Sequence, residues 1–123
     1  KIDADWIKKH IHRDNCMMTY LGRPNYSECG FLYFNMKHPD IQPYANRMKS
    51  LYDTDGIYNL KEQHDSFIWD YVRKEFENRG TKNYDIGDGK MGHVQARSIL
   101  GTVYDHTKGP RRKAAGKSAE FNL

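Results

Sequence analysis

The sequence predicts a mixed α/β fold, in which helices flank a small mixed sheet. Two short apolar segments, residues 16–21 and 31–34, have the length and composition of buried strands. Two longer segments, residues 41–52 and 65–78, repeat apolar residues at the three- and four-residue spacing of amphipathic helices. Short strands combined with helices of this length are typical of an α/β domain.

Composition limits the size and the partners of this domain. The 123 residues suffice for one domain, and we assign residues 1–107 to it and residues 108–123 to a basic tail. A net charge of +4 favours anionic partners, either nucleotide phosphates or nucleic acid. No apolar run approaches the ~18 residues of a membrane span. With only two cysteines, we expect free thiols and a reducing compartment, the cytoplasm.

The strand segments are bounded by turn residues. Residues 6–13 fit a short helix or turn, and the strand at 16–21 stops at the Gly-Arg-Pro-Asn of residues 22–25. Residues 31–34 place aromatic side chains on both faces of a strand, so we expect both faces to be covered.

The helices have recognisable ends. Asp40 is the expected N-cap of the first, and the second closes at Gly80. The expected buried stripes are Ile41, Tyr44, Met48, Leu51 and Tyr52 in the first helix, and Phe67, Ile68, Tyr71, Val72 and Phe76 in the second. Beyond them, the glycine-rich residues 83–92 predict a loop, and residues 94–104 predict a short strand.

Two carboxylates near the start of the sequence are the first candidate site. Asp3 and Asp5 follow Ile2 with the spacing that puts both on one side of a strand, so we expect the end of a buried strand here. Two such carboxylates favour a hard cation, Mg²⁺ or Mn²⁺, although an exposed acidic strand end has the same pattern. His106 precedes a Gly-Pro turn and three cations, and it can supply a further ligand. The alternative is a disordered basic tail.

Four segments, taken in order, resemble nucleotide-sugar glycosyltransferases of the GT-A fold, most closely the retaining family-8 pattern. Residues 2–5 resemble the metal-binding Asp-x-Asp of that family, and residues 26–35 resemble its Tyr-Phe-Asn-Ser-Gly-Val-Leu-Leu-Phe-Asn strand. Glu62-Gln63-His64-Asp65 resembles its Asp-Gln-Asp, with His64 inserted. Residues 106–112 resemble its closing His-x-x-Gly-x-x-Lys, with Arg112 in the lysine position and Lys113-Ala114 after it in place of Pro-Trp. The chain also resembles glycosyltransferase-like proteins of phages and environmental bacteria.

The resemblance implies a role for each segment. Asp3, Asp5 and His106 would bind Mn²⁺ or Mg²⁺, and the diphosphate would be bound by Lys108, Gly109 and Arg112. Asp65 and His64 would be the catalytic or sugar-orienting residues, and the sugar pocket would be lined by Tyr26, Ser27 and Glu28. The implied reaction transfers a sugar from a nucleotide diphosphate to an acceptor hydroxyl.

Alternatives remain for these residues. Asp65 is equally well explained as a helix N-cap, Tyr26 as a core residue and Glu28 as a solvated side chain. In the GT-A fold a βαβ region before Asp-x-Asp holds the base. We therefore expect the chain to be the C-terminal half of a longer enzyme, to receive that half from another chain, or to be an inactive fragment. The rival function is a basic nucleic-acid-binding module, for which the aromatic and cationic residues suffice.

Overall fold

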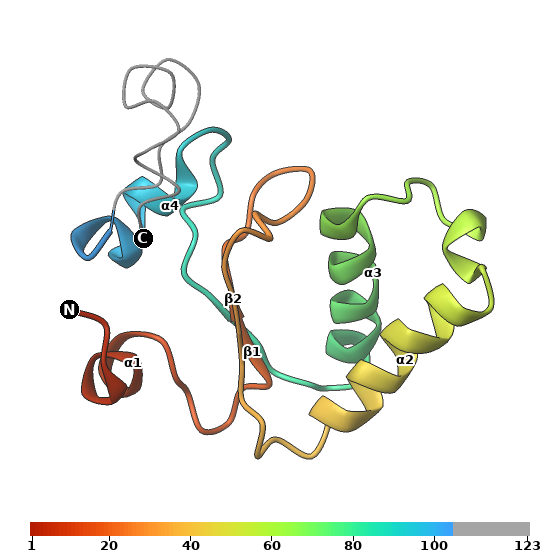
Figure 1. Cartoon of the computed structure of the whole chain (residues 1–123), viewed down its shortest axis with the longest axis horizontal. Coiled ribbons are helices and arrows are strands. Elements are labelled where there is room, and N and C mark those ends of the chain that lie inside the picture. The colour runs from red at the N-terminus through yellow and green to blue at the C-terminus, as the bar shows by residue number, and fades with distance from the viewer. Residues whose placement is uncertain (105–123) are drawn as a thin grey trace, which may run out of the picture.

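The computed structural model describes residues 1–104, and its elements form a mixed α/β fold as predicted (Figure 1). In chain order the elements are α1 (Ala4–His10), β1 (Met18–Tyr20), β2 (Leu32–Phe34), α2 (Ile41–Asp53), the 3-10 helix η1 (Gly56–Asn59), α3 (Asp65–Asn78), β3 (Tyr84–Asp85), α4 (Val94–Arg97) and the 3-10 helix η2 (Ile99–Thr102).

The sheet has the order β2-β1-β3, with β1 at its centre. β1 pairs with β2 in antiparallel register, Thr19 opposite Tyr33, and with β3 in parallel register, Thr19 opposite Tyr84. Side chains alternate between the two faces of such strands. The sheet is therefore a divider between two separate apolar clusters.

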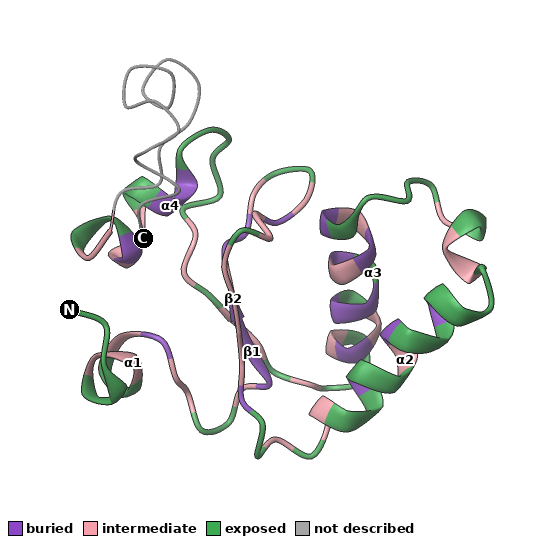
Figure 2. Ribbon diagram, viewed as in Figure 1, coloured by how far each residue is buried: buried purple, intermediate pink, exposed green. Residues whose placement is uncertain are grey.

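The larger cluster lies between the sheet and the helix pair α2 and α3, which pack against each other on one side of the sheet (Figure 1). The inward faces of both helices are buried (Figure 2). Its aromatic centre is Tyr44, whose ring stacks on Trp69 at 5.6 Å and meets Phe76 edge-on at 5.5 Å. Tyr44 also donates a hydrogen bond to the Trp69 carbonyl at 3.1 Å, and burial raises the pKa of its hydroxyl. The cluster consists of Met17, Met18, Tyr44, Met48, Leu51, Ile68, Val72 and Phe76.

The smaller cluster covers the opposite face of the sheet, where α1, α4 and η2 lie (Figure 1). Its buried residues are Ile11, Leu21, Val94 and Leu100, with Phe31 and Tyr33 from the β2 segment packed against them. Phe34, the next residue, packs into the larger cluster instead. The expectation that this aromatic strand is covered on both faces is confirmed.

The predicted strands at 16–21 and 31–34 and both amphipathic helices are confirmed, but one residue of each helix stripe is not buried as expected. Tyr52 and Tyr71 are exposed rather than buried, at 45% and 37%. Each lies at the edge of its stripe, where a tyrosine ring can pack by one side and keep its hydroxyl in water. Asp40 precedes α2 but makes no capping bond, because its carboxylate accepts a hydrogen bond from the Thr81 hydroxyl at 2.6 Å.

Of the predictions for the C-terminal part of the fold, the strand at 94–104 is wrong and the loop at 83–92 is correct except for one short strand. Residues 94–104 form α4 and η2 instead of a strand, because Ser98 Oγ accepts a hydrogen bond from the Leu100 amide and starts the 3-10 turn. The expected loop at 83–92 contains β3, which forms through pairing with β1 rather than through local β propensity. Gly80 ends α3 as predicted, with φ +103°.

Within residues 1–104, no helix has the length and apolar character needed to cross a membrane. Both cysteines, Cys16 and Cys29, are free thiols.

Candidate functional site

The turn between β1 and β2 packs against the start of α3, which brings two of the sequence-predicted segments together. The ring of Tyr26 meets the imidazole of His64 edge-on, with centroids 4.7 Å apart. The Arg23 guanidinium lies over the Tyr26 ring, 5.3 Å from its centroid. Tyr26 is half-buried in this contact rather than part of either core cluster. The alternative of Tyr26 as a core residue is therefore wrong.

A buried carboxylate holds this turn in place. Asp70, on α3, accepts a hydrogen bond from the Ser27 amide at 2.6 Å and pairs with Arg73 at 3.4 Å. Ser27 is only 3% exposed. Arg23 also fixes the turn, because its guanidinium donates hydrogen bonds to the carbonyls of Tyr26 and Ser27 at 3.1 and 3.3 Å. Ser27 therefore stabilises the turn through its backbone amide and carbonyl, both of which are hydrogen-bonded.

Glu28 lies close to Gln95 and Tyr104, in the C-terminal part of the described chain. Its carboxylate accepts a hydrogen bond from the Gly30 amide at 2.9 Å and lies 3.5 Å from Arg23 Nη1. A Cβ on Gly30 would meet Glu28 and Gln95 together, which places these two side chains beside each other. Burial raises the pKa of Tyr104, and the Glu28 charge raises it further. With its side chain only 13% exposed, Glu28 is not the solvated residue of the alternative interpretation.

His64 and Asp65 begin α3, and both residues are exposed. His64 is the N-cap, because its Nδ1 accepts a hydrogen bond from the Phe67 amide at 3.3 Å. Asp65 is the first helical residue rather than the cap, and its exposed carboxylate accepts from the Ser66 amide at 2.7 Å. The alternative that Asp65 is only an N-cap is therefore wrong. The Asp65 carboxylate keeps acceptor capacity for a ligand.

The thiol of Cys29 marks where the turn touches the start of α3. Burial raises its pKa to about 11, a hydrogen bond with Ser66 opposes that shift, and the Asp65 charge adds to it. Cys29 is thus neutral at physiological pH and is a packing contact, because a reactive cysteine needs its thiolate form.

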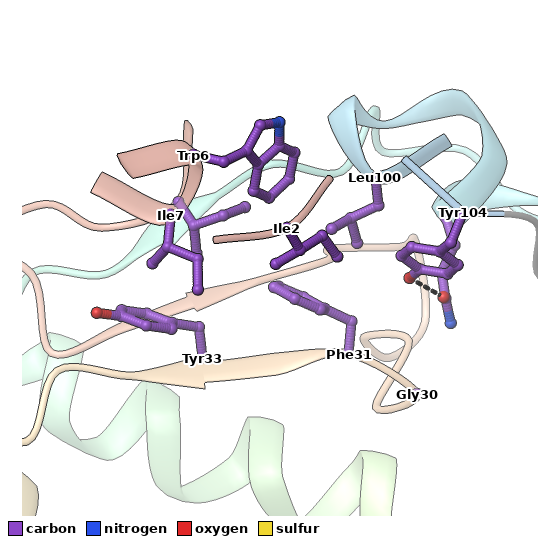
Figure 3. A pocket seen from close by; sticks show the side chains of 10 residues that line it. Ile2, Trp6, Ile7, Gly30, Phe31, Tyr33, Leu100 and Tyr104 are labelled. Atoms are coloured by element: carbon purple, nitrogen blue, oxygen red, sulfur yellow. Dashed lines mark hydrogen bonds between the residues drawn. The ribbon is translucent and has the colours of Figure 1, made fainter. Parts of the chain in front are cut away.

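An apolar cavity of about 330 Å³ lies on the α1 face of the sheet (Figure 3). Phe31 and Tyr33 point into it from the β2 segment, and Ile2 lies between Trp6 and Leu100 (Figure 3). Tyr104 closes one side and donates a short hydrogen bond to Gln95 Oε1. The cavity thus brings Ile2 and Tyr104, from distant parts of the sequence, to one place.

The expectation that Asp3 and Asp5 end a buried strand is wrong. Asp3 is the N-cap of α1, and its Oδ1 accepts a hydrogen bond from the Trp6 amide at 2.9 Å. Asp5 lies in the first helical turn, and both carboxylates are exposed. Aspartate at an N-cap and in a first turn is a favourable helix start, which outweighs the strand reading of so short a segment.

The donor chemistry of these two carboxylates fits a hard divalent cation, since both offer only oxygen. Asp3 keeps its second oxygen free of capping, and no described residue pairs with the Asp5 side chain. Within residues 1–104, no three histidine, cysteine or acidic side chains gather closely enough to hold a metal ion. The remaining ligand would have to come from elsewhere. The expected one, His106, lies outside the described residues, as do Lys108, Gly109 and Arg112.

The structure joins some of the predicted site residues and separates others. Tyr26 contacts His64, and Cys29 links the same turn to Asp65 and Ser66. Asp3 and Asp5 belong to α1, on the opposite face of the sheet from α3 (Figure 1). Gly30, at the end of the turn, lines the cavity that Ile2 also lines, so the turn adjoins both groups.

Sequence reasoning missed the polar residues that support this arrangement. Asp70 and Arg73 are each 7% exposed, and Arg73 also donates to Glu77 at 2.7 Å and to the Tyr20 hydroxyl at 3.2 Å. The signal in the sequence was the spacing of Asp70 and Arg73, an acid and a base three residues apart on either side of the buried Val72. Such a pair on an exposed face looks the same in sequence.

No family model matches the chain, and no curated protein or solved structure is significantly similar to it.

Proposed function

We propose that this chain is a metal-dependent glycosyltransferase of the GT-A type, which transfers a sugar from a nucleotide diphosphate to an acceptor hydroxyl. The observation that carries the proposal is the cavity shared by Ile2 and Tyr104. Ile2 directly precedes Asp3, and Tyr104 precedes His106 by two residues. Residues beside both parts of the expected metal motif, far apart in sequence, therefore line one cavity.

The contact between Tyr26 and His64 supports the sugar-binding part of the proposal. These residues belong to two separate segments of the family resemblance, and their rings lie 4.7 Å apart. An aromatic ring beside an exposed carboxylate, here that of Asp65, suits a sugar, because the ring packs on C–H groups while the carboxylate accepts from hydroxyls. Tyr26, His64 and Asp65 would bind and orient the donor sugar.

The leaving diphosphate sets the electrostatic requirement of the reaction. A divalent cation, when bound by Asp3, Asp5 and His106, would neutralise negative charge on the diphosphate. Arg112 and Lys108 would bind the phosphate oxygens, with the planar guanidinium able to take two oxygens at once. Cavity residues such as Trp6 and Tyr104 would exclude water from the sugar side of the diphosphate.

The transfer itself needs one proton acceptor. The acceptor oxygen forms a bond to the anomeric carbon as the bond from that carbon to the diphosphate oxygen breaks, and the acceptor hydroxyl loses its proton. If the reaction inverts the anomeric centre, Asp65 takes this proton as a general base. If it retains that centre, Asp65 orients the sugar and the departing phosphate oxygen takes the proton.

The proposal is tested by calorimetric titration of uridine diphosphate into the chain, with Mn²⁺ and then with a chelator. We expect binding with Mn²⁺ and none with the chelator. Asp5→Asn should abolish the Mn²⁺-dependent binding of uridine diphosphate. Asp3→Asn should do the same while keeping α1 capped, since asparagine caps a helix as well as aspartate does.

Asp55→Asn is the matched control. Asp55 is exposed, lies far from α1 in sequence and has φ 57°, a conformation that asparagine tolerates. The Asp55→Asn variant should bind uridine diphosphate with Mn²⁺ as the unchanged chain does. Unchanged Mn²⁺-dependent binding in Asp5→Asn would remove Asp5 from the metal site. Binding that ignores the metal, or oligonucleotide binding that weakens steeply with salt, would favour the nucleic-acid-binding alternative.

A further inference from the structure

A second and larger concavity, of about 890 Å³, lies at the other end of α1. We call it the α1–β2 groove. One wall is the end of α1 and the segment after it, including Lys8, His12 and Arg13, and the other is the end of β2 and the turn that follows, including Lys37 and His38. Ile7 and Tyr33 line this groove and the apolar cavity alike, so the two are adjacent.

The charge of the α1–β2 groove is positive. Lys8, Arg13 and Lys37 are permanent cations, and Asp14 is the one carboxylate among its lining residues. Asp14 is occupied by His12, whose Nε2 donates to its Oδ1 at 2.7 Å. The cations outnumber the carboxylate, which favours an anionic ligand.

The cations of the groove differ in how far they are already engaged. Arg13 stacks over the Tyr84 ring at 4.4 Å and donates to the Tyr84 hydroxyl at 3.2 Å, so its guanidinium is held in place. The side chains of Lys8 and Lys37 make no hydrogen bond or ion pair with any residue of the described range. These two ammonium groups, from opposite walls, have donors to offer a ligand.

The groove also offers an ordered aromatic wall and a neutral donor. With Nε2 donating to Asp14, His12 Nδ1 accepts from the Tyr33 hydroxyl at 2.9 Å, and this bond fixes the Tyr33 ring. His38 Nδ1 accepts a hydrogen bond from the Asp40 amide at 3.0 Å, which leaves the Nε2 hydrogen of its neutral form free to donate. Aromatic surface beside cationic donors suits a phosphate attached to a ring.

We propose that the α1–β2 groove is a metal-independent binding site for a small phosphomonoester that carries a ring. Lys8 and Lys37 bind the phosphate from the two walls, His38 adds a hydrogen bond, and the ring of the ligand packs on Tyr33. The site uses none of the residues assigned above to metal, diphosphate or donor sugar, and the inference stands independently of the proposed glycosyl transfer.

The test is an NMR titration of the isotopically labelled chain with phenyl phosphate, in the presence of a chelator. We expect saturable shifts of the backbone amides at 8–14 and 33–38. The double variant Lys8→Gln/Lys37→Gln should weaken binding by about tenfold, the sum expected for two partly screened ion pairs. Lys61→Gln, which removes an exposed lysine outside the groove, should leave the affinity unchanged.

Two further ligands separate the possible sources of binding. Phenol should not saturate the site, which shows that the phosphate is required, and inorganic phosphate should shift the same amides more weakly. Phenyl phosphate shifts that avoid the groove, or an unchanged affinity in the double variant, would overturn the proposal. So would binding of a short oligonucleotide without binding of phenyl phosphate. Asp5→Asn should bind phenyl phosphate normally, so failure of the metal site is distinguishable from failure of this one.

Discussion

The two faces of the sheet are built differently. On the α2–α3 face, two long helices enclose eight buried residues with an aromatic centre at Tyr44. On the α1 face, short helices enclose four buried residues and leave an apolar cavity and a cationic groove. Close packing stabilises a fold, whereas open space on a structured wall is what binds ligands. The difference assigns most of the stability to the α2–α3 face, whereas the apolar cavity and the cationic groove lie on the α1 face.

Truncating one residue on each face gives the largest expected contrast. Ile68→Ala should lower the free energy of unfolding by about 4 kcal/mol, because Ile68 is fully buried in the larger cluster. Leu100→Ala should cost about 2 kcal/mol, because Leu100 already borders a cavity and loses fewer contacts. Urea unfolding measures both. Equal losses would mean that the α1 face is packed as tightly as the other.

This contrast also explains what the sequence could predict. The α2–α3 face follows from local periodicity, since Tyr44, Met48 and Leu51 on one helix and Ile68, Val72 and Phe76 on the other are spaced at helical intervals. The α1 face is assembled from short elements whose form depends on tertiary contacts. Neither β3 nor α4 is long enough to carry a periodic signal.

The sequence could predict which segments contribute to the candidate site, but not how these segments are arranged in space. The contact of Tyr26 with His64 joins two segments that the family resemblance had named separately. The placement of Asp3 as a helix cap was missed, because an apolar residue followed by alternating aspartates fits a strand end and a helix start alike. The support from Asp70 required knowing which face of α3 meets the turn.

Asp70 joins the α2–α3 face to the turn that contributes to the candidate site, and its loss should be the next largest effect. Asp70→Ala should cost about 3 kcal/mol, because it orphans the buried Ser27 amide and removes one partner of Arg73. Asp53→Ala, at an exposed carboxylate on α2, should cost under about 1 kcal/mol. Urea unfolding compares the two.

Hydrogen exchange sharpens this test. In Asp70→Ala, which removes the acceptor, the Ser27 amide should exchange faster than in the unchanged chain while amides within α2 stay protected. If the Ser27 amide kept its protection, Asp70 would not be what holds the turn.

The smallest expected effect is a difference in the alkylation rates of the two cysteines. Burial raises the pKa of Cys29 to about 11, so its thiolate fraction at pH 8 is very small, and alkylation should accelerate as the pH rises through about 11. Cys16 is less buried, and the charges of Arg13 and Lys82 oppose the rise of its pKa. Iodoacetamide should therefore label Cys16 first at pH 8, as read by peptide mass spectrometry. Equal labelling rates would show that the turn opens from α3 faster than the reagent reacts.

The central position of β1 has a consequence for the order of folding. Its antiparallel partner β2 is close in sequence, whereas its parallel partner β3 arrives only after α2 and α3 have been passed, with Tyr84 opposite Thr19. Closing the longer loop costs more chain entropy, and contacts of high sequence separation form slowly. A nascent chain would thus hold a hairpin and a helix pair before its third strand docks, and the α1 face, with its cavity and groove, would be the last part of the molecule to acquire its shape.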